Sequence, residues 1–262
     1  MAIVIQLPDV ASAGDFGLIA LPSLSKCRAY HLLGGSQAES IANRVAADQP
    51  LTVAGLPIYE PDCAVLSSTA GFVRPVAGSQ YDRTVVIVFA DPYQAPASAP
   101  AEPTEAAMAD SLPVVWWGGQ YNGLFLFANV WKLRPRADGG TSDIDTSAYN
   151  GSADRPWFYP DGTMRKGGYR MAVIRQRAAD ATLWVQNGAI LQLIGTVARN
   201  DVGGAPMASK FGGIGGTAAS VLRVAAIAEF TALTDAEVAA VADFIAADVE
   251  ARGIDFWGRS AG

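Results

Sequence analysis

The clearest local pattern in the chain is a β-hairpin. Two runs of largely apolar residues, ATLWVQ and AILQLI, flank the pair Asn187 and Gly188. Asn-Gly tolerates the two positive φ angles of a type I′ turn, which joins antiparallel strands with only two residues. A two-residue turn at this place pairs Trp184 with Leu191 across the strands. The chain is therefore expected to contain an antiparallel sheet.

Further strand-like runs extend this sheet. Residues 84–89 (TVVIVF) are β-branched, aromatic and apolar on both faces, which predicts a central strand covered on both sides. Residues 223–230 alternate with a period of two, so their even-numbered members are expected on one face. Trp116 and Trp117 are adjacent, so alternation is expected to bury one of them. With 27 glycines and 15 prolines for turns, and 262 residues of which half are apolar, we predict one antiparallel β-sandwich domain.

An amphipathic helix follows the last strand, over about residues 234–251. Thr234 is the expected N-cap and Glu237 follows three residues later, so the two form a capping box. Gly253 is suited to the left-handed conformation that often ends a helix. One apolar stripe runs along the helix, formed by Val238, Val241, Ile245 and Val249. The stripe predicts that the helix closes the sandwich.

Residues 1–33 carry apolar pieces split by glycine and proline. They are expected to form an edge strand or an extended arm, with the sandwich domain over residues 34–262. An arm of this kind becomes ordered when it adds a strand to a sheet edge or lies in a groove. We therefore expect it to contact a neighbouring subunit in a symmetric homo-oligomer. A short helix is expected over residues 37–47.

Charge and composition argue against several classes of protein. The net charge of −6 includes no basic stripe, so nucleic acid is not an expected partner. The longest uncharged window, residues 111–131, is broken by Pro113 and by glycines, so no membrane span is expected. The N-terminus lacks the basic region of a secretory signal. Cys27 and Cys63 are too few for a disulfide framework or a zinc site.

Three motifs stand in order toward the C-terminus. They are residues 211–216 (FGGIGG), residues 227–230 (IAEF) and residues 233–237 (LTDAE), and the amphipathic helix follows them. This order resembles the end of concanavalin A-like, laminin-G-type jelly rolls. The hairpin around Asn187 resembles a stretch of the same family.

A second set of motifs lies upstream. It comprises residues 40–43 (SIAN), residues 51–59 (LTVAGLPIY) and residues 84–89 (TVVIVF). Their order and spacing resemble phage tail and virion proteins that carry this sandwich. The resemblance implies a tail- or fibre-associated virion protein, made in the host cytoplasm, whose partners are other virion subunits and host-surface glycan. A capsid decoration protein is the alternative role within a virion.

The jelly-roll family also includes glycoside hydrolases, which place two carboxylates on either side of the scissile bond. The family carries these acids at alternate positions of one strand, and no glutamate here has such a partner. Glu229 falls at a strand end and Glu237 belongs to the helix cap. His31, the only histidine, lies beside two leucines and is expected to be a packed or a surface residue without a catalytic role. We expect no catalytic residues, and the alternative is a polysaccharide depolymerase with acids in the loop of residues 134–168.

That same loop holds the candidate contact residues. Trp157, Phe158 and Tyr159 lie together in polar surroundings, where aromatic rings are available to stack on a sugar or to contact a partner. Asp143 and Asp145 are weak candidate ligands for Ca²⁺, because they offer alternate carboxylates without the regular spacing of a calcium loop. No other metal or cofactor is expected.

Overall fold

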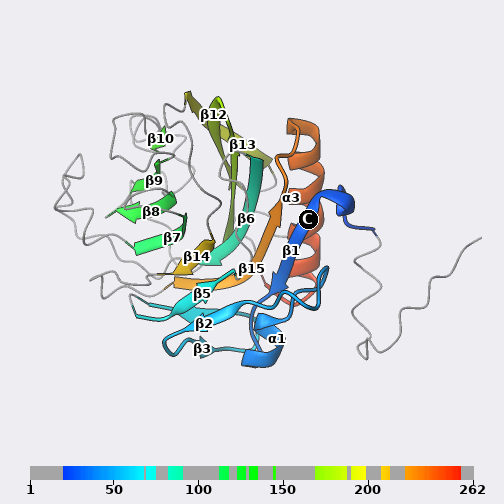
Figure 1. Ribbon diagram of the computed structural model, residues 1–262, viewed down its shortest axis with the longest axis vertical. Helices are drawn as coiled ribbons and strands as arrows, with labels where there is room; N and C mark the ends of the chain where they lie inside the picture. Colours follow the sequence, from blue (N-terminus) through cyan, green and yellow to red (C-terminus); the bar gives the residue numbers. More distant parts are fainter. Residues whose placement is uncertain are drawn as a thin grey trace, which may run out of the picture.

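The computed structural model describes residues 20–67, 69–74, 82–90, 112–117, 123–127, 130–134, 144–145, 169–187, 190–198, 208–212 and 222–254. Two antiparallel sheets pack face to face, and α3 (Asp235–Glu250) lies along the outer face of the larger sheet (Figure 1). This arrangement confirms the predicted antiparallel β-sandwich with a C-terminal amphipathic helix. Within the described ranges, no helix has the length and hydrophobicity that crossing a bilayer requires.

The larger sheet, sheet A, contains eight strands. In spatial order they are β13 (Ile190–Ala198), β12 (Asp180–Asn187), β11 (Tyr169–Arg177), β6 (Asp82–Ala90), β15 (Leu222–Phe230), β4 (Ala64–Leu66) and β3 (Ile58–Tyr59), and β1 (Cys27–Leu32) also pairs with β15. β15 is thus a central strand, with β6 on one side and both β1 and β4 on the other.

The smaller sheet, sheet B, contains seven strands. In spatial order they are β10 (Ile144–Asp145), β9 (Val130–Arg134), β8 (Gly123–Phe127), β7 (Leu112–Trp117), β14 (Ser209–Gly212), β5 (Gly71–Val73) and β2 (Thr52–Ala54). The helix expected over residues 37–47 is shorter, because α1 (Gln37–Ile41) ends at Ile41.

Sheet A carries apolar side chains on both faces, because sheet B covers one face and α3 the other. In β6, Val85, Ile87 and Phe89 belong to the core between the sheets, whereas Val86 and Val88 belong to the core beneath α3. All five side chains are at most 1% exposed. The prediction of a central, doubly covered strand over residues 84–89 is confirmed.

β15 has the predicted position but not the predicted alternation. Its register against β6 shifts between Val224 and Ala226, which marks a β-bulge. An extra residue in one strand reverses the faces that follow it. Val224 therefore lies in the core between the sheets, whereas Ala226, Ala228 and Phe230 face α3. The prediction that the even-numbered residues share one face is wrong at Val224.

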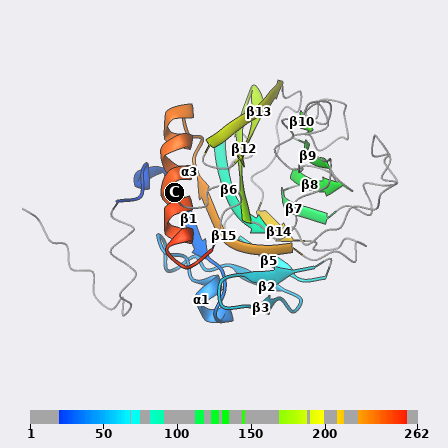
Figure 2. The same cartoon turned by 180° about the vertical axis from the view of Figure 1, so that it is seen from behind.

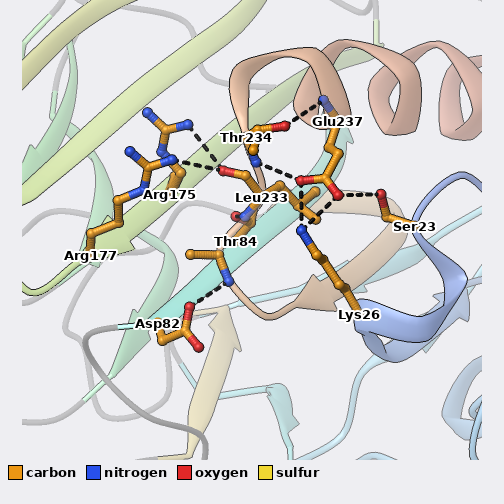
Figure 3. A network of polar contacts seen from close by, with 10 residues as sticks. Ser23, Lys26, Asp82, Thr84, Arg175, Arg177, Leu233, Thr234 and Glu237 are labelled. Carbon is orange, nitrogen blue, oxygen red and sulfur yellow. Dashed lines mark hydrogen bonds and ion pairs between the residues drawn. The ribbon is translucent and has the colours of Figure 1, made fainter.

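The closing helix begins as predicted. The Thr234 hydroxyl accepts a hydrogen bond from the Glu237 amide at 3.3 Å, and the Glu237 carboxylate accepts one from the Thr234 amide at 2.8 Å (Figure 3). Lys26 Nζ binds the same carboxylate at 2.7 and 2.8 Å. Gly253 follows the helix with a φ of 84°. The predicted stripe of Val238, Val241, Ile245 and Val249 is buried against sheet A.

The short connection between β15 and α3 is bonded to sheet A (Figure 3). The Leu233 carbonyl accepts hydrogen bonds from Arg175 at 3.1 Å and from Arg177 at 3.2 Å, and the Leu233 amide donates to Thr84 Oγ1 at 3.0 Å. Arg175 also lies over the Trp184 ring, with its guanidinium carbon 4.7 Å from the ring centroid. These contacts fix the start of the helix to β6 and β11.

The N-terminal region differs from the extended arm expected over residues 1–33. β1 pairs antiparallel with β15 of its own chain, with Tyr30 opposite Ala228, and it lies next to α3 (Figures 1 and 2). Tyr30 is fully buried and its hydroxyl bonds Asp248 of the helix. The sandwich therefore includes Cys27–Leu32, because this segment fills the edge of a central strand that would otherwise be open. Residues 1–19 lie outside the described residues, so their expected contact with a neighbouring subunit stays a prediction.

The hairpin is present, but its register differs from the prediction. β12 and β13 pair Gln186 with Leu191 and Trp184 with Leu193, so Asn187 is the last paired residue of β12. The predicted pairing of Trp184 with Leu191 is wrong. From Trp184 to Asn187 both registers keep the same faces for the paired side chains, since the two registers differ there by two residues.

Candidate functional site

A buried polar cluster lies between the two sheets, formed by Arg74, Arg83, Ser209 and Glu229. Arg74 Nη1 is 3.0 Å from Glu229 Oε1, and Ser209 Oγ donates to Glu229 Oε2 at 3.0 Å. Arg83 Nη1 donates to the same Ser209 hydroxyl at 2.9 Å. The four residues are at most 3% exposed. We call this group the interior cluster.

Strand alternation brings the interior cluster together. Arg83 is two residues before Val85 on β6, and Ser209 is two residues before Phe211 on β14, so both share faces with core residues. Glu229 likewise follows Ile227 on the inner face of β15. Sheet B therefore supplies the hydroxyl and sheet A supplies the carboxylate and one guanidinium.

Two further polar side chains are buried on the same side of sheet A. Gln176 of β11 is paired in register with Arg83, and neither its side-chain nitrogen nor its side-chain oxygen has a partner among the described residues. His31 Nδ1 lies 3.0 Å from the Ala42 carbonyl oxygen, and its Nε2 is buried without a described partner. Burial, aided by the charge of Arg74, lowers the pKa of His31 to about 4, so the imidazole is neutral near pH 7.

The chemistry of the interior cluster is that of a structural ion pair. Both oxygens of Glu229 are engaged, one by Arg74 and one by Ser209. Glycoside hydrolysis needs two carboxylates roughly 5–9.5 Å apart on either side of the sugar. Among its described residues, the cluster contributes Glu229 alone. A general base must also reach its substrate, and Glu229 is 1% exposed.

A second polar group lies at the turn between β3 and β4, where Glu60, Asp62 and Cys63 bring possible metal-ligand atoms within 4.8 Å of one another. Arg223 already holds the Glu60 carboxylate with two hydrogen bonds, at 3.0 and 3.2 Å. These bonds lower the pKa of Glu60. Burial raises the pKa of the Cys63 thiol to about 12, although a hydrogen bond with Tyr169 opposes this. In the described structure, Glu60 of this group is therefore the ion-pair partner of Arg223.

The sequence reasoning did not identify the interior cluster. It placed Glu229 at a strand end, which is confirmed because β15 ends at Phe230, but it did not predict that Glu229 is buried at an inward position of this central strand. A signal was available in the sequence. Arg83 and Glu229 carry opposite charges and stand at inward-facing positions of two strands that are otherwise largely apolar. Charged residues are almost never fully buried without a partner.

The candidate contact residues of the sequence analysis fall outside this cluster. Trp157, Phe158, Tyr159 and Asp143 lie outside the described residues. The backbone of Asp145 lies in β10, opposite Lys132 of β9. The aromatic contact and the Ca²⁺ site therefore stay predictions.

The arrangement of the sheets is similar to that of several solved β-sandwich domains. The binding domain of botulinum neurotoxin serotype D aligns over 85% of this chain and 52% of its own, with a TM-score of 0.54 and 11% identity. The serotype D ligand-binding domain in complex with N-acetylneuraminic acid aligns over 88% and 52%, with a TM-score of 0.56 and 9% identity. Trypanosoma rangeli sialidase aligns over 87% and 34%, with a TM-score of 0.56 and 16% identity.

These likenesses show the fold of the chain, an antiparallel β-sandwich. The chain spans about half the length of the neurotoxin domains and about a third of the sialidase. No protein-family model matches the sequence. No curated protein sequence matches it either.

Proposed function

We propose that this β-sandwich is a non-enzymatic glycan-binding domain. The observation that carries the proposal is the match over 88% of the chain to a neurotoxin domain that was solved with N-acetylneuraminic acid. A lectin-like sandwich presents rigid sheet faces and loops, on which a few polar and aromatic groups select a sugar. The interior cluster adds support for binding over hydrolysis, because its carboxylate is neutralised by Arg74 and closed to solvent.

The proposal includes a place in a phage virion, as a tail- or fibre-associated subunit that meets host-surface glycan. It rests on the motifs of residues 40–43, 51–59 and 84–89 and on their order. In support, residues 52–54 form β2, residues 58–59 form β3 and residues 84–89 lie in β6. Antibody against this chain is expected to label the tails of intact particles in electron micrographs. Labelling of the capsid surface would favour the decoration role instead.

Glycan binding is tested directly with purified protein on an array of bacterial surface polysaccharides and animal oligosaccharides. We expect dose-dependent binding to a subset of sugars. Polysaccharide incubated with excess protein is expected to keep its chain length on size-exclusion chromatography. Progressive shortening would support a depolymerase with acids in the loop of residues 134–168. An absence of binding to every sugar would overturn the glycan-binding proposal.

A further inference from the structure

The turn between β3 and β4 brings together Glu60, Asp62 and Cys63, and we call it the thiol turn. Two carboxylate oxygens and one sulfur of these side chains all lie within 4.8 Å of one another. β3 and β4 pair Tyr59 with Ala64, so Glu60 and Cys63 are the next two positions that face each other. The two residues between them form the loop of the hairpin. The hairpin thus sets a carboxylate and a thiol side by side, with a second carboxylate at its tip.

The backbone of the thiol turn is held firmly. The Glu60 amide donates to the Cys63 carbonyl at 2.9 Å, and the Glu60 carbonyl accepts from the Gly35 amide at 2.7 Å. Gly34 lies so close that a Cβ atom at its position would be 2.5 Å from the Cys63 nitrogen and 2.7 Å from the Asp62 carbonyl carbon. Groups that are already fixed lose less conformational entropy when they bind a ligand. The turn is therefore preorganised.

The spacing of its side chains suits a tetrahedral metal ion. Cys63 Sγ is 3.3 Å from Glu60 Oε2. A zinc ion bonds sulfur at about 2.3 Å and carboxylate oxygen at about 2.0 Å, and a tetrahedral angle between these bonds puts the two ligand atoms roughly 3.5 Å apart. Only a small movement of either side chain is needed to admit the ion.

The charges of the group also favour a dication. Arg223 holds the Glu60 carboxylate with two hydrogen bonds, at 3.0 and 3.2 Å. Hydrogen bonds of this kind orient a carboxylate that binds a metal, and each oxygen keeps a further lone pair. Among the described residues, no hydrogen bond or ion pair engages the Asp62 carboxylate. Because the Cys63 thiol gives up its proton to solvent on binding, one dication adds a single net charge, which balances Asp62.

The sulfur determines which ion fits. Thiolate is a soft ligand that Zn²⁺ accepts, whereas Mg²⁺ and Ca²⁺ take oxygen ligands. The Cys63 side chain is fully buried and is hydrogen-bonded by Tyr169 of β11, which fixes its direction. The Glu60 side chain is 34% exposed, so an ion can reach the group from solvent.

We propose that the thiol turn binds one Zn²⁺ ion through the sulfur of Cys63 and one oxygen each of Glu60 and Asp62, with water as the fourth ligand. Arg223 of β15 and Tyr169 of β11 orient the ligands from outside. The ion thereby fastens the edge hairpin of sheet A to two of its central strands. This site goes beyond the proposed glycan binding, which uses no metal ion.

Metal titration of the reduced, chelator-treated protein tests the proposal. We expect calorimetry to show that Zn²⁺ binds with a dissociation constant below about 100 µM. Co²⁺, a spectroscopic substitute for Zn²⁺, is expected to produce a thiolate-to-cobalt charge-transfer absorption that Zn²⁺ abolishes. Ca²⁺ and Mg²⁺ are expected to leave this absorption unchanged. Zn²⁺ should also raise the melting temperature.

Variants locate the site. Cys63→Ser is expected to remove the charge-transfer absorption, and Cys63→Ser and Asp62→Asn are each expected to weaken Zn²⁺ binding about tenfold or more. Cys27→Ser and Asp48→Asn change the same residue types elsewhere, so they are the matched controls and are expected to bind like the unmodified protein. Melting temperatures verify folding. Should Cys63→Ser fail to fold, Asp62→Asn and the cobalt absorption of the unmodified protein carry the test.

Three outcomes would each overturn the inference. They are a dissociation constant for Zn²⁺ above about 100 µM, a Co²⁺ complex without the thiolate absorption, and thiol-turn variants that bind Zn²⁺ like their controls. None of them bears on the glycan array, so the two proposals stand or fall separately.

Discussion

Removing the charge of Glu229 should destabilise the protein strongly. Glu229→Gln keeps the shape of the side chain and retains an oxygen that can accept the Ser209 hydroxyl, but it leaves the Arg74 guanidinium buried without its counter-charge. The paired side chains are 4% and 1% exposed, so solvent screens the interaction very little. Breaking a buried pair by altering one partner costs about 3–5 kcal/mol. Urea unfolding followed by tryptophan fluorescence should show this loss as a lower midpoint with an unchanged slope.

Two companion variants make the reasoning refutable. Arg74→Met combined with Glu229→Gln removes both charges of the pair and is expected to recover most of the lost stability, because neither member of the pair then keeps its charge without the other. Glu60→Gln breaks an ion pair with Arg223 whose side chains are 39% and 34% exposed, and it is expected to cost less than about 1 kcal/mol. If Glu229→Gln lowers the free energy of unfolding no more than Glu60→Gln does, burial of the charge is not the reason that the interior cluster stabilises the fold.

The other predictions concern the helix, pH and the loop. Thr234→Ala removes the cap and should cost about 1 kcal/mol, whereas Ile245→Ala opens a cavity under the helix and should cost about 2–4 kcal/mol; denaturant melts in which both changes are negligible would contradict the packing of α3. His31 has a pKa of about 4 when folded against 6.5 ordinarily, so the unfolded chain takes up its proton first. Stability from this group is therefore complete above pH 6.5 and falls as the pH drops toward 4, by up to roughly 3 kcal/mol. His31→Gln should flatten that part of the pH profile of the melting temperature, and an unchanged profile would contradict the assignment. Trp157→Ala should weaken glycan binding several-fold with little change in melting temperature, while a large loss of stability would indicate a core role instead.

Patterns of neighbouring residues in the sequence predicted the elements that are formed by interactions between neighbouring residues. The capping box of Thr234 and Glu237 and the apolar stripe of the helix involve residues at most four positions apart, and both are present. The run of β6 that is apolar on both faces predicted a central strand equally clearly. The hairpin register was not predictable in the same way. Pairing Trp184 with Leu191 or with Leu193 puts the same side chains on the same faces, so the hydrophobic pattern does not distinguish them.

The polar site depended on long-range geometry. Arg83 and Ser209 are 126 residues apart in the chain, and their contact requires that β6 and β14 face each other from different sheets. The bulge near Ala226 also changed which residues of β15 point inward. Likewise, alternation predicted that one of Trp116 and Trp117 enters the core. Only the register shows that Trp117 shares a row with the buried Ser209 and Trp116 a row with Lys210.

The position of β15 has a consequence for biosynthesis. This strand is followed by α3 alone among the described elements, yet it lies between β6 on one side and β1 and β4 on the other. A ribosome must therefore release more than 220 residues before sheet A can close, and until then β6 presents an edge that is apolar on both faces over residues 85–90. Exposed edges of this kind associate with other chains. Truncated or stalled products that end before Leu222 should therefore collect in inclusion bodies, and co-expression with a chaperone that binds nascent chains should raise the yield of the intact protein.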